Sequence, residues 1–559
     1  VYKRQTHEDE ANGAMTGIGR REVMSWMGIG AIAPMLSACS GLAPVRPDRQ
    51  SELQLLYFAD TLDARQPGQP VVPATRLGPV SHLGRAPWIS GSDARQARSE
   101  LNPLLDARLA EGASTGGYAV LGAVLEELRQ RHGAERCLTL ENGQGWNGSG
   151  LAYLTQGESG AQGSQLLGSE VRVSSDERIL WPQRCAGLYR QFARPVLGAG
   201  LAEEQAKTLG VQPFTLIRRA GLRIAVVGIT DPYAGDQQAS LKQWYQSLLP
   251  AFKAARGQAD LVIALADVGT GPGLWLAERL GDADLLLCAR GQDFWPTPIE
   301  VLQSSGRRVP VVLGGCRASG AFHIGCQRQA GQWTFVARFH PAFEQLLSPA
   351  GQAHAADLRS QLQSQRAAHA AWLDQPLARA PQALWRRDTR GGSWDRLLHQ
   401  ALCDDGQMQV LLPGLRYDSP VAAGQAITRE QLISLTGGYP AGVVEAPVKP
   451  LESVLENAAE QLFGDPLLLD NSQDLPRWQG QSWQVNYSPS GRRVSGLQPL
   501  QGMCRSISLA VDASAGEPLW QRVETWLSRQ PKDWQLPALH LPEVRYVQGH
   551  PGWHPRGVS

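Results

Sequence analysis

Short apolar runs alternate with longer amphipathic stretches over residues 52–345. The runs predict β-strands at Leu53–Phe58, Cys137–Leu140, Leu222–Ile229, Asp260–Leu265, Ala283–Leu287 and Pro310–Leu313. Apolar residues at helical spacing predict amphipathic helices over Ala119–Arg131 and Leu241–Arg256. Strands that alternate with helices in this way indicate an α/β domain.

A second pattern begins after residue 345. An Ala-, Gln- and Arg-rich stretch without Pro or Gly predicts a helix from Ala353 to Leu373, and prolines at 376 and 381 follow it. A helix at Leu451–Phe463 and short strands near Trp483–Tyr487 and Ile507–Val511 are then expected. Because 559 residues are too many for one hydrophobic core, we predict an α/β domain over 52–345, a connector over 346–381 and a smaller α+β domain over 382–559.

The N-terminal region predicts export. We take residues 1–14 as a non-native leader and 15–38 as a signal peptide, since Arg20-Arg21 precedes a short apolar segment as in substrates of the Tat exporter. Leu36-Ser37-Ala38-Cys39 resembles a lipobox, which predicts a lipid on Cys39, a tether over 39–51 and a periplasmic, membrane-anchored protein. A plain signal peptide with a chance Cys is the alternative.

Composition changes this picture little. The net charge of +1 gives no electrostatic reason to expect nucleic acid as a partner. Of the eight Cys, Cys39 is assigned to the lipid, and no CxxC spacing occurs among the others, so a zinc site has no support and buried, inert thiols are expected for most of them.

Polar residues follow five of the apolar segments, at the strand ends where α/β folds place their chemistry. We call these segments the strand-end loops: residues 60–62, 143–149, 174–177, 265–269 and 288–293. They resemble the ligand loops of a two-metal phosphoesterase, but such a site needs several Asp, His and Asn ligands around two cations. These loops contain no His.

Several short motifs occur in order along the chain and identify a resemblance. They are Gly116-Gly117-Tyr118-Ala119, Trp146-Asn147-Gly148-Ser149, Leu412-Pro413-Gly414-Leu415-Arg416, Ala426-Ile427-Thr428-Arg429-Glu430 and Gly516-Glu517-Pro518-Leu519-Trp520. Together they make the mature chain resemble the thiosulfohydrolases of the sulfur-oxidation (Sox) system, a SoxB-like branch of the 5′-nucleotidase family. The resemblance implies a calcineurin-like metallophosphoesterase domain, a two-sheet sandwich flanked by helices, and a 5′-nucleotidase C-terminal-type α+β domain.

The resemblance also implies an activity that this chain departs from. The family's enzymes are dimanganese hydrolases that release sulfate from a thiosulfonate on a carrier protein's Cys-bearing tail. Where their motifs supply His, a bridging Asp or Asn, this chain differs at most positions. The former metal-site positions are Asp60, Leu62, Gln144, Ser175, Asp176, Asp267, Arg290 and Gln292. A neutral amide at 144 cannot offset two divalent charges, and Arg290 adds a fixed positive charge.

We therefore expect a pseudoenzyme without a cofactor, which binds a sulfur-carrier protein or a small oxyanion. Arg290 is the candidate anion-binding residue, unless it pairs with Asp267 or Asp293. The alternative is an active hydrolase with one Mn or Mg ion on a rebuilt carboxylate site. Its ligands would be Asp60, Asp176, Asp267 and Asp293. An unrelated binding role in the cell envelope stays open, as does a role for His82 near the cleft.

Overall fold

The chain divides into a short N-terminal unit, Val1–Arg46, and a large unit, Pro47–Ser559. The computed structural model describes the following parts of the large unit: 53–68, 78–82, 85–88, 115–232, 240–386, 390–403, 409–414, 417, 419–436, 441–447, 451–467, 474–479, 483–487, 491–497, 503–509, 518–538 and 541–546. The predicted leader, signal peptide, Cys39 and tether lie outside these residues. Within them, no helix is long and apolar enough to cross a membrane.

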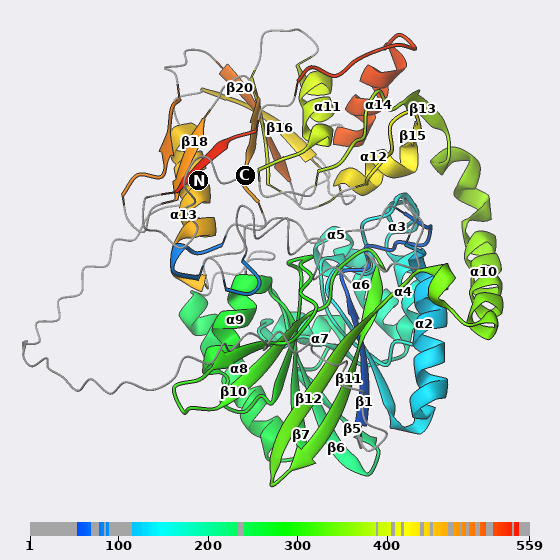
Figure 1. Cartoon of the computed structure of the whole chain (residues 1–559), viewed down its shortest axis with the longest axis vertical. Helices are drawn as coiled ribbons and strands as arrows, with labels where there is room; N and C mark the ends of the chain where they lie inside the picture. Colours follow the sequence, from blue (N-terminus) through cyan, green and yellow to red (C-terminus); the bar gives the residue numbers. More distant parts are fainter. Residues whose placement is uncertain are drawn as a thin grey trace, which may run out of the picture. The chain divides into compact units, whose positions relative to one another are not determined.

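Two six-stranded sheets carry the first half of the large unit (Figure 1). The first has the order β12-β11-β1-β2-β3-β4, in which β1 to β4 run parallel and β11 is antiparallel to β1. Its strands are β1 Leu53–Ala59, β2 Cys137–Asn142, β3 Val171–Val173, β4 Val196–Leu197, β11 Gly320–Gln329 and β12 Gln332–Pro341.

The second sheet has the order β5-β6-β7-β8-β10-β9, and its four central strands are parallel. Its strands are β5 Phe214–Arg219, β6 Leu222–Ile229, β7 Leu261–Asp267, β8 Leu285–Ala289, β9 Ile299–Leu302 and β10 Arg308–Leu313. The six strands predicted from the apolar runs are all present, with ends that differ by a few residues at most.

Alternating residues of the strands fill two different cores, because successive side chains in a strand point to opposite faces. In β7, Leu261, Ile263 and Leu265 pack between the two sheets, whereas Val262 and Ala264 pack against the helices on the outer face. Both faces of β7 are therefore buried, which explains why its sequence is a continuous apolar run. The predicted two-sheet sandwich flanked by helices is confirmed.

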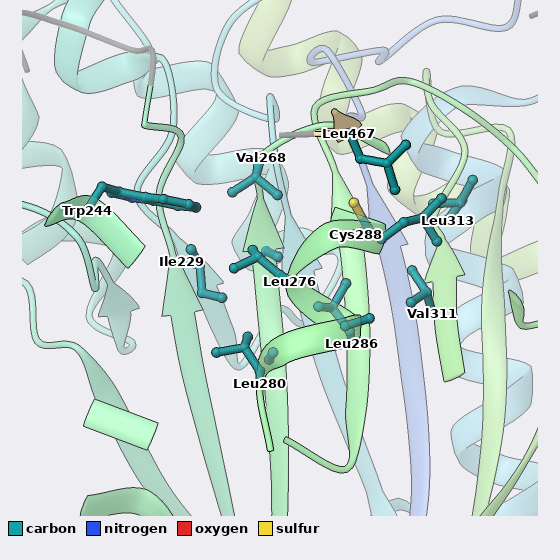
Figure 2. Close-up of a cluster of buried hydrophobic side chains, with 14 of the residues drawn as sticks. Ile229, Trp244, Val268, Leu276, Leu280, Leu286, Cys288, Val311, Leu313 and Leu467 are labelled. Carbon is teal, nitrogen blue, oxygen red and sulfur yellow. The ribbon is translucent and has the colours of Figure 1, made fainter. Parts of the chain in front are cut away.

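Helices cover the outer faces of both sheets. On the first sheet, α2 (Gly117–His132) packs beside α10 (Pro349–Leu373), which contains the predicted helix over 353–373 (Figure 1). On the second sheet, α8 (Leu241–Arg256) and α9 (Thr270–Arg279) bury side chains such as Trp244 and Leu276, as Figure 2 shows. The remaining helices of this half are α3 Gly150–Thr155, α4 Glu158–Leu166, α5 Glu177–Leu180, α6 Pro182–Phe192 and α7 Glu203–Leu209.

The second half is an α+β arrangement of smaller sheets, as expected. The four-stranded sheet is β16-β20-β14-β17 (β16 Ala441–Pro447, β20 Met503–Leu509, β14 Gln409–Leu412, β17 Arg477–Gln479). The smaller sheets are β19-β18-β21 (β19 Val494–Ser495, β18 Gln484–Tyr487, β21 Glu543–Tyr546) and β13-β15 (β13 Pro376–Arg379, β15 Ala426–Thr428). The helices are α11 Ser393–Leu402, α12 Arg429–Thr436, α13 Leu451–Phe463 and α14 Leu519–Ser528.

The two halves share hydrophobic clusters. Leu467, which follows α13, packs in the same cluster as Leu313 of β10 and Cys288 of β8 (Figure 2). Leu151 of α3 packs in the cluster that contains Trp394 of α11. The domain limits at 345 and 381 stay a prediction, but the halves are joined by buried apolar contacts. Of the six cysteines with described side chains, five are buried, as expected.

Candidate functional site

The strand-end loops meet at one edge of the sandwich. β1 and β2 of the first sheet run parallel to each other, as do β7 and β8 of the second, so the carboxyl ends of each pair lie at the same edge of its sheet. Hydrogen bonds connect the loops that follow these strands, as the next paragraphs describe. Asp60, Gln144, Asp267 and Arg290 therefore lie close together.

Asp60 ties three of the loops together. Its carboxylate is buried and accepts hydrogen bonds from the backbone N–H groups of Gln144 (3.0 Å), Arg290 (3.1 Å) and Gln292 (3.0 Å). Burial is the main cause that raises the pKa of Asp60 to about 7, and the nearby Asp267 carboxylate is the second. The three N–H groups lower this pKa but do not offset the rise. Asp60 thus links its own loop to the loops that carry Gln144 and Arg290.

Gln144 stands where the resemblance implies a bridging Asp, and its amide is satisfied on all sides. The Nε2 group donates to Asp176 Oδ2 at 2.6 Å and to the Tyr417 hydroxyl at 2.8 Å. The Oε1 atom accepts a hydrogen bond from Gln292 Nε2 at 3.0 Å. The Tyr417 hydroxyl also accepts a hydrogen bond from Asn147 at 3.1 Å. An amide in this network holds side chains in place without adding negative charge.

The Arg290 guanidinium lies among carboxylates. Its Nη2 atom is 2.5 Å from Asp176 Oδ1 and 3.4 Å from Asp267 Oδ2, and its Nε atom is 3.3 Å from Asp231 Oδ2. The three Asp side chains are buried, and the Arg290 side chain is 14% exposed. Burial raises the pKa of Asp267 to about 6; the Arg290 guanidinium opposes the rise, and Asp176 adds to it.

A buried ion-pair cluster supports the second and third loops. Arg172 of β3 contacts Glu177 at 2.7 Å and Glu141 at 3.6 Å, and its guanidinium lies 3.9 Å from the ring centroid of Trp146. Glu177 also accepts a hydrogen bond from the backbone N–H of Ser175 at 3.0 Å. Charge-assisted hydrogen bonds between Arg172, Glu177 and the backbone of Ser175 therefore hold the loop that carries Asp176 in place.

Other residues predicted for the site also form hydrogen bonds with neighbouring residues of the chain. Leu62 is buried, and its N–H donates to the Gln144 carbonyl at 2.8 Å. Asp293 accepts a hydrogen bond from the Thr270 hydroxyl. Asp60, Leu62, Arg290 and Gln292 have positive φ angles of 45°, 52°, 69° and 50°. Such backbone angles in residues other than Gly are unfavourable and concentrate at functional sites.

A pair of manganese ions does not fit the residues present. The strand-end loops offer no imidazole, the Gln144 amide replaces a bridging carboxylate, and a guanidinium lies among the remaining acids. In the described part of the chain, no group of three or more His, Cys, Asp or Glu side chains is arranged to hold a metal ion. His82, the other residue considered for the cleft, lies in η1 (Val80–His82), and burial lowers its pKa.

Comparison with solved structures shows which proteins share this fold. The sulfate thiohydrolase SoxB of Thermus thermophilus, solved in complex with glycerol, matches with a TM-score of 0.74 over 89% of this chain and 97% of its own, at 22% identity. A 5′-nucleotidase precursor from Thermus thermophilus matches with a TM-score of 0.66 over 88% and 99%, at 15% identity. The chain has the fold of SoxB and the 5′-nucleotidases. A 5′-nucleotidase from Candida albicans matches with a TM-score of 0.53 over 86% and 98%, at 8% identity.

The likeness to SoxB lies in the fold more than in the sequence. No protein-family model matches the chain, and no curated protein matches it. Identities at or below 22% with SoxB and the 5′-nucleotidases show a shared fold.

Two residues of the site were missed by the sequence analysis. Asp231 follows β6 directly after Thr230, so the rule that located the other loops could have found it. Tyr417 belongs to the second half and gave no signal in the sequence, because only the contact between the halves brings its hydroxyl to Gln144. Tyr417 thus brings a residue of the second half into the site.

Proposed function

We propose that the chain is a catalytically degenerate SoxB-like protein that acts in the periplasm as a binding or accessory protein in the oxidation of sulfur compounds. The observation that carries the proposal is the placement of Arg290 among Asp176, Asp231 and Asp267. A guanidinium stays protonated under all physiological conditions and repels divalent cations from this position. The function is therefore assigned to binding rather than to metal-dependent hydrolysis.

The proposed partner is a sulfur-carrier protein, and a small oxyanion is the other candidate ligand. Support for the carrier comes from the fold, which is that of a protein described as a sulfate thiohydrolase. Carboxylates on three sides of the Arg290 guanidinium weigh against direct capture of an anion by this residue, since its charge is already offset. Anion binding by Arg290 stays a prediction.

Metal analysis and activity assays test the loss of catalysis. Protein expressed with excess manganese is expected to hold no stoichiometric metal and to release no sulfate from a thiosulfonate and no phosphate from a nucleotide. The Thermus SoxB protein, treated in the same way, is the positive control for the assay. Bound manganese together with hydrolysis that Asp60→Ala or Asp267→Ala abolishes would replace the proposal with the rebuilt carboxylate site.

Export and lipid attachment form a separate part of the proposal. Cys39→Ala is expected to release the protein from the membrane fraction, because the lipid on Cys39 supplies the anchor. Replacement of Arg20-Arg21 by two Lys is expected to leave precursor in the cytoplasm. A membrane fraction unchanged by Cys39→Ala would refute the lipoprotein assignment without affecting the assignment of the site.

A further inference from the structure

A groove of about 660 Å³ lies at the edge of the sandwich opposite to the strand-end loops. The residues that precede β7 and β8 border it, together with the turns of the β9–β10 and β11–β12 hairpins. The seven residues of β7 separate this groove from the end of the strand at Asp267, a length of about 20 Å. Volumes of this size are typical of pockets for small molecules. The groove is thus distinct from the cleft and large enough for an organic ligand.

Four arginines and three acids line the groove: Arg256, Arg307, Arg308, Arg328, Asp260, Asp284 and Glu300. Asp284 pairs with Arg256 at 2.6 Å and with Arg307 at 3.7 Å. Asp260 pairs with Arg223, which adjoins the groove, at 3.1 Å. Two of the three acids therefore already have a guanidinium partner, and they leave the positive charge of other arginines in the groove uncompensated.

Arg308 and Arg328 carry this positive charge. Both side chains are exposed, and neither forms an ion pair with a residue that the structure describes. Burial raises the pKa of Glu300, and the Arg308 guanidinium opposes that rise without reaching ion-pair distance. A guanidinium presents its N–H groups in a planar fork that matches the oxygens of a carboxylate or phosphate group. The two arginines thus favour an anionic ligand.

Two aromatic side chains give the groove an apolar surface. Trp333 and Phe335 of β12 line it and are only partly buried against the core between the sheets. Because alternate residues of a strand share a face, the two rings lie on the same side of β12. The Trp333 Nε1–H group donates to the Asp260 carbonyl at 2.9 Å, which fixes the ring, and the Arg328 guanidinium lies 5.9 Å from its centroid. Such a surface suits a ligand with a flat apolar part.

We propose that this groove binds a small organic anion, with a flat apolar part on Trp333 and Phe335 and its negative group paired with Arg308 and Arg328. The ligand class is an aromatic or heteroaromatic ring that carries a carboxylate, sulfonate or phosphate group. The inference goes beyond the proposed function, because the groove lies at the other edge of the sandwich and shares no residue with the strand-end loops.

Calorimetric titration of the full-length protein with naphthalene-2-sulfonate at low ionic strength tests the proposal. One molecule is expected to bind per chain, and 2-naphthol, which has the same ring without the charge, is expected to bind at least about tenfold more weakly. Arg308→Gln and Arg328→Gln are each expected to weaken binding of the sulfonate by about fivefold. Trp333→Leu is expected to weaken the binding of both compounds.

Two further variants separate this groove from adsorption to other parts of the surface. Arg279→Gln is a matched control, since the Arg279 guanidinium lies 4.3 Å from the ring centroid of Trp275 but pairs with Glu278. It is expected to leave the affinity unchanged. Glu300→Gln removes a negative charge from the groove and is expected to tighten binding of the sulfonate by about threefold.

Three outcomes would overturn the inference. They are no binding of naphthalene-2-sulfonate at millimolar concentration, equal binding of 2-naphthol, and unchanged affinity in Arg308→Gln and Arg328→Gln variants that keep the melting temperature of the wild type. Each of these results leaves the proposed function intact. Manganese-dependent hydrolysis at the strand-end loops would instead defeat the proposed function and leave the assignment of the groove unaffected.

Discussion

At the scale of single residues, the site is a cluster of buried acids beside one arginine. Asp60 has three backbone donors and no ion pair within the described part of the chain, while Asp176, Asp231 and Asp267 share one guanidinium. Burial raises the pKa values of Asp60 and Asp267 above the usual range for Asp. Proton binding by these acids is therefore linked to folding.

The raised pKa of Asp60 predicts how stability changes with pH. Because the folded protein holds this proton more tightly than the unfolded chain, the stabilisation is fully present below about pH 4 and is lost as the pH rises to about 7. Asp60→Asn cannot titrate, so the stability of the wild type relative to Asp60→Asn is expected to fall as the pH rises from about 4 to about 7. Urea unfolding at several pH values measures this difference.

A matched acid with the opposite shift serves as the control. Hydrogen bonds from Arg223 hold the pKa of the partly exposed Asp260 below its usual value. The contribution of Asp260 to stability is present above the pKa that Asp has in the unfolded chain. It is lost only as the pH falls below about 4. The difference between Asp260→Asn and the wild type is thus expected to stay constant from about pH 5 to about pH 8. A constant difference for Asp60→Asn as well would contradict the predicted linkage.

At the scale of secondary structure, the loops after β1, β2 and β8 are packed closely enough to exclude a single methyl group. Gly143 has a φ of +74°, and a Cβ atom there would lie 2.1 Å from Asp60 Oδ1 and 2.8 Å from the Cβ of Ala289. A side chain at this position would separate the ends of three strands. Glycine is required here both by its backbone angle and by this close approach.

Gly143→Ala is accordingly expected to lower the free energy of unfolding by clearly more than backbone strain alone. Overpacking of a close contact costs about 1–3 kcal/mol, in addition to about 1–2 kcal/mol for the left-handed backbone. Gly210→Ala is the control, since Gly210 has a φ of +71° with no atom within 4 Å of the added Cβ. Equal losses in urea unfolding would show that the loops do not constrain position 143.

At the scale of the whole molecule, polar and apolar contacts fix the second half against the sandwich. The Tyr417 hydroxyl accepts hydrogen bonds from Gln144 and Asn147, and Glu430 accepts one from the backbone N–H of Gly150 at 2.7 Å. Burial raises the pKa of Glu430, and Arg366 lies 3.5 Å from its carboxylate. The cleft loops are thus held by residues from both halves of the chain.

Removing the Tyr417 hydroxyl tests this connection. Tyr417→Phe removes the acceptor of one N–H group of the Gln144 amide and one of the Asn147 amide in a buried place, which is expected to cost about 1–3 kcal/mol of stability. Hydrogen exchange in residues 143–149 is expected to become faster. Tyr153→Phe is the control, because the Tyr153 ring packs against Trp520 and its hydroxyl has no hydrogen-bond partner among the described residues. Unchanged exchange in Tyr417→Phe would show that the hydroxyl does not restrain the loop.

The sequence by itself determined the elements and the ends of the strands. The apolar runs that form β1, β6, β7 and β8 can be recognised in the sequence alone. A strand that is buried on both faces needs apolar side chains at successive positions. The same runs located Asp60, Gln144, Asp267 and Arg290, since polar residues at strand ends stand out from their surroundings. Losses such as Leu62 for His could be read directly from the residue type.

Only the tertiary structure decided which of these residues contact one another. The sequence analysis allowed Arg290 to bind an anion or to pair with Asp267 or Asp293, and the fold gives it Asp176, Asp231 and Asp267. Tyr417 reaches Gln144 across 273 positions of the chain. Ion pairs and hydrogen bonds depend on distances of a few ångströms between residues remote in sequence, and hydrophobic periodicity specifies which face is buried but not which side chains meet there.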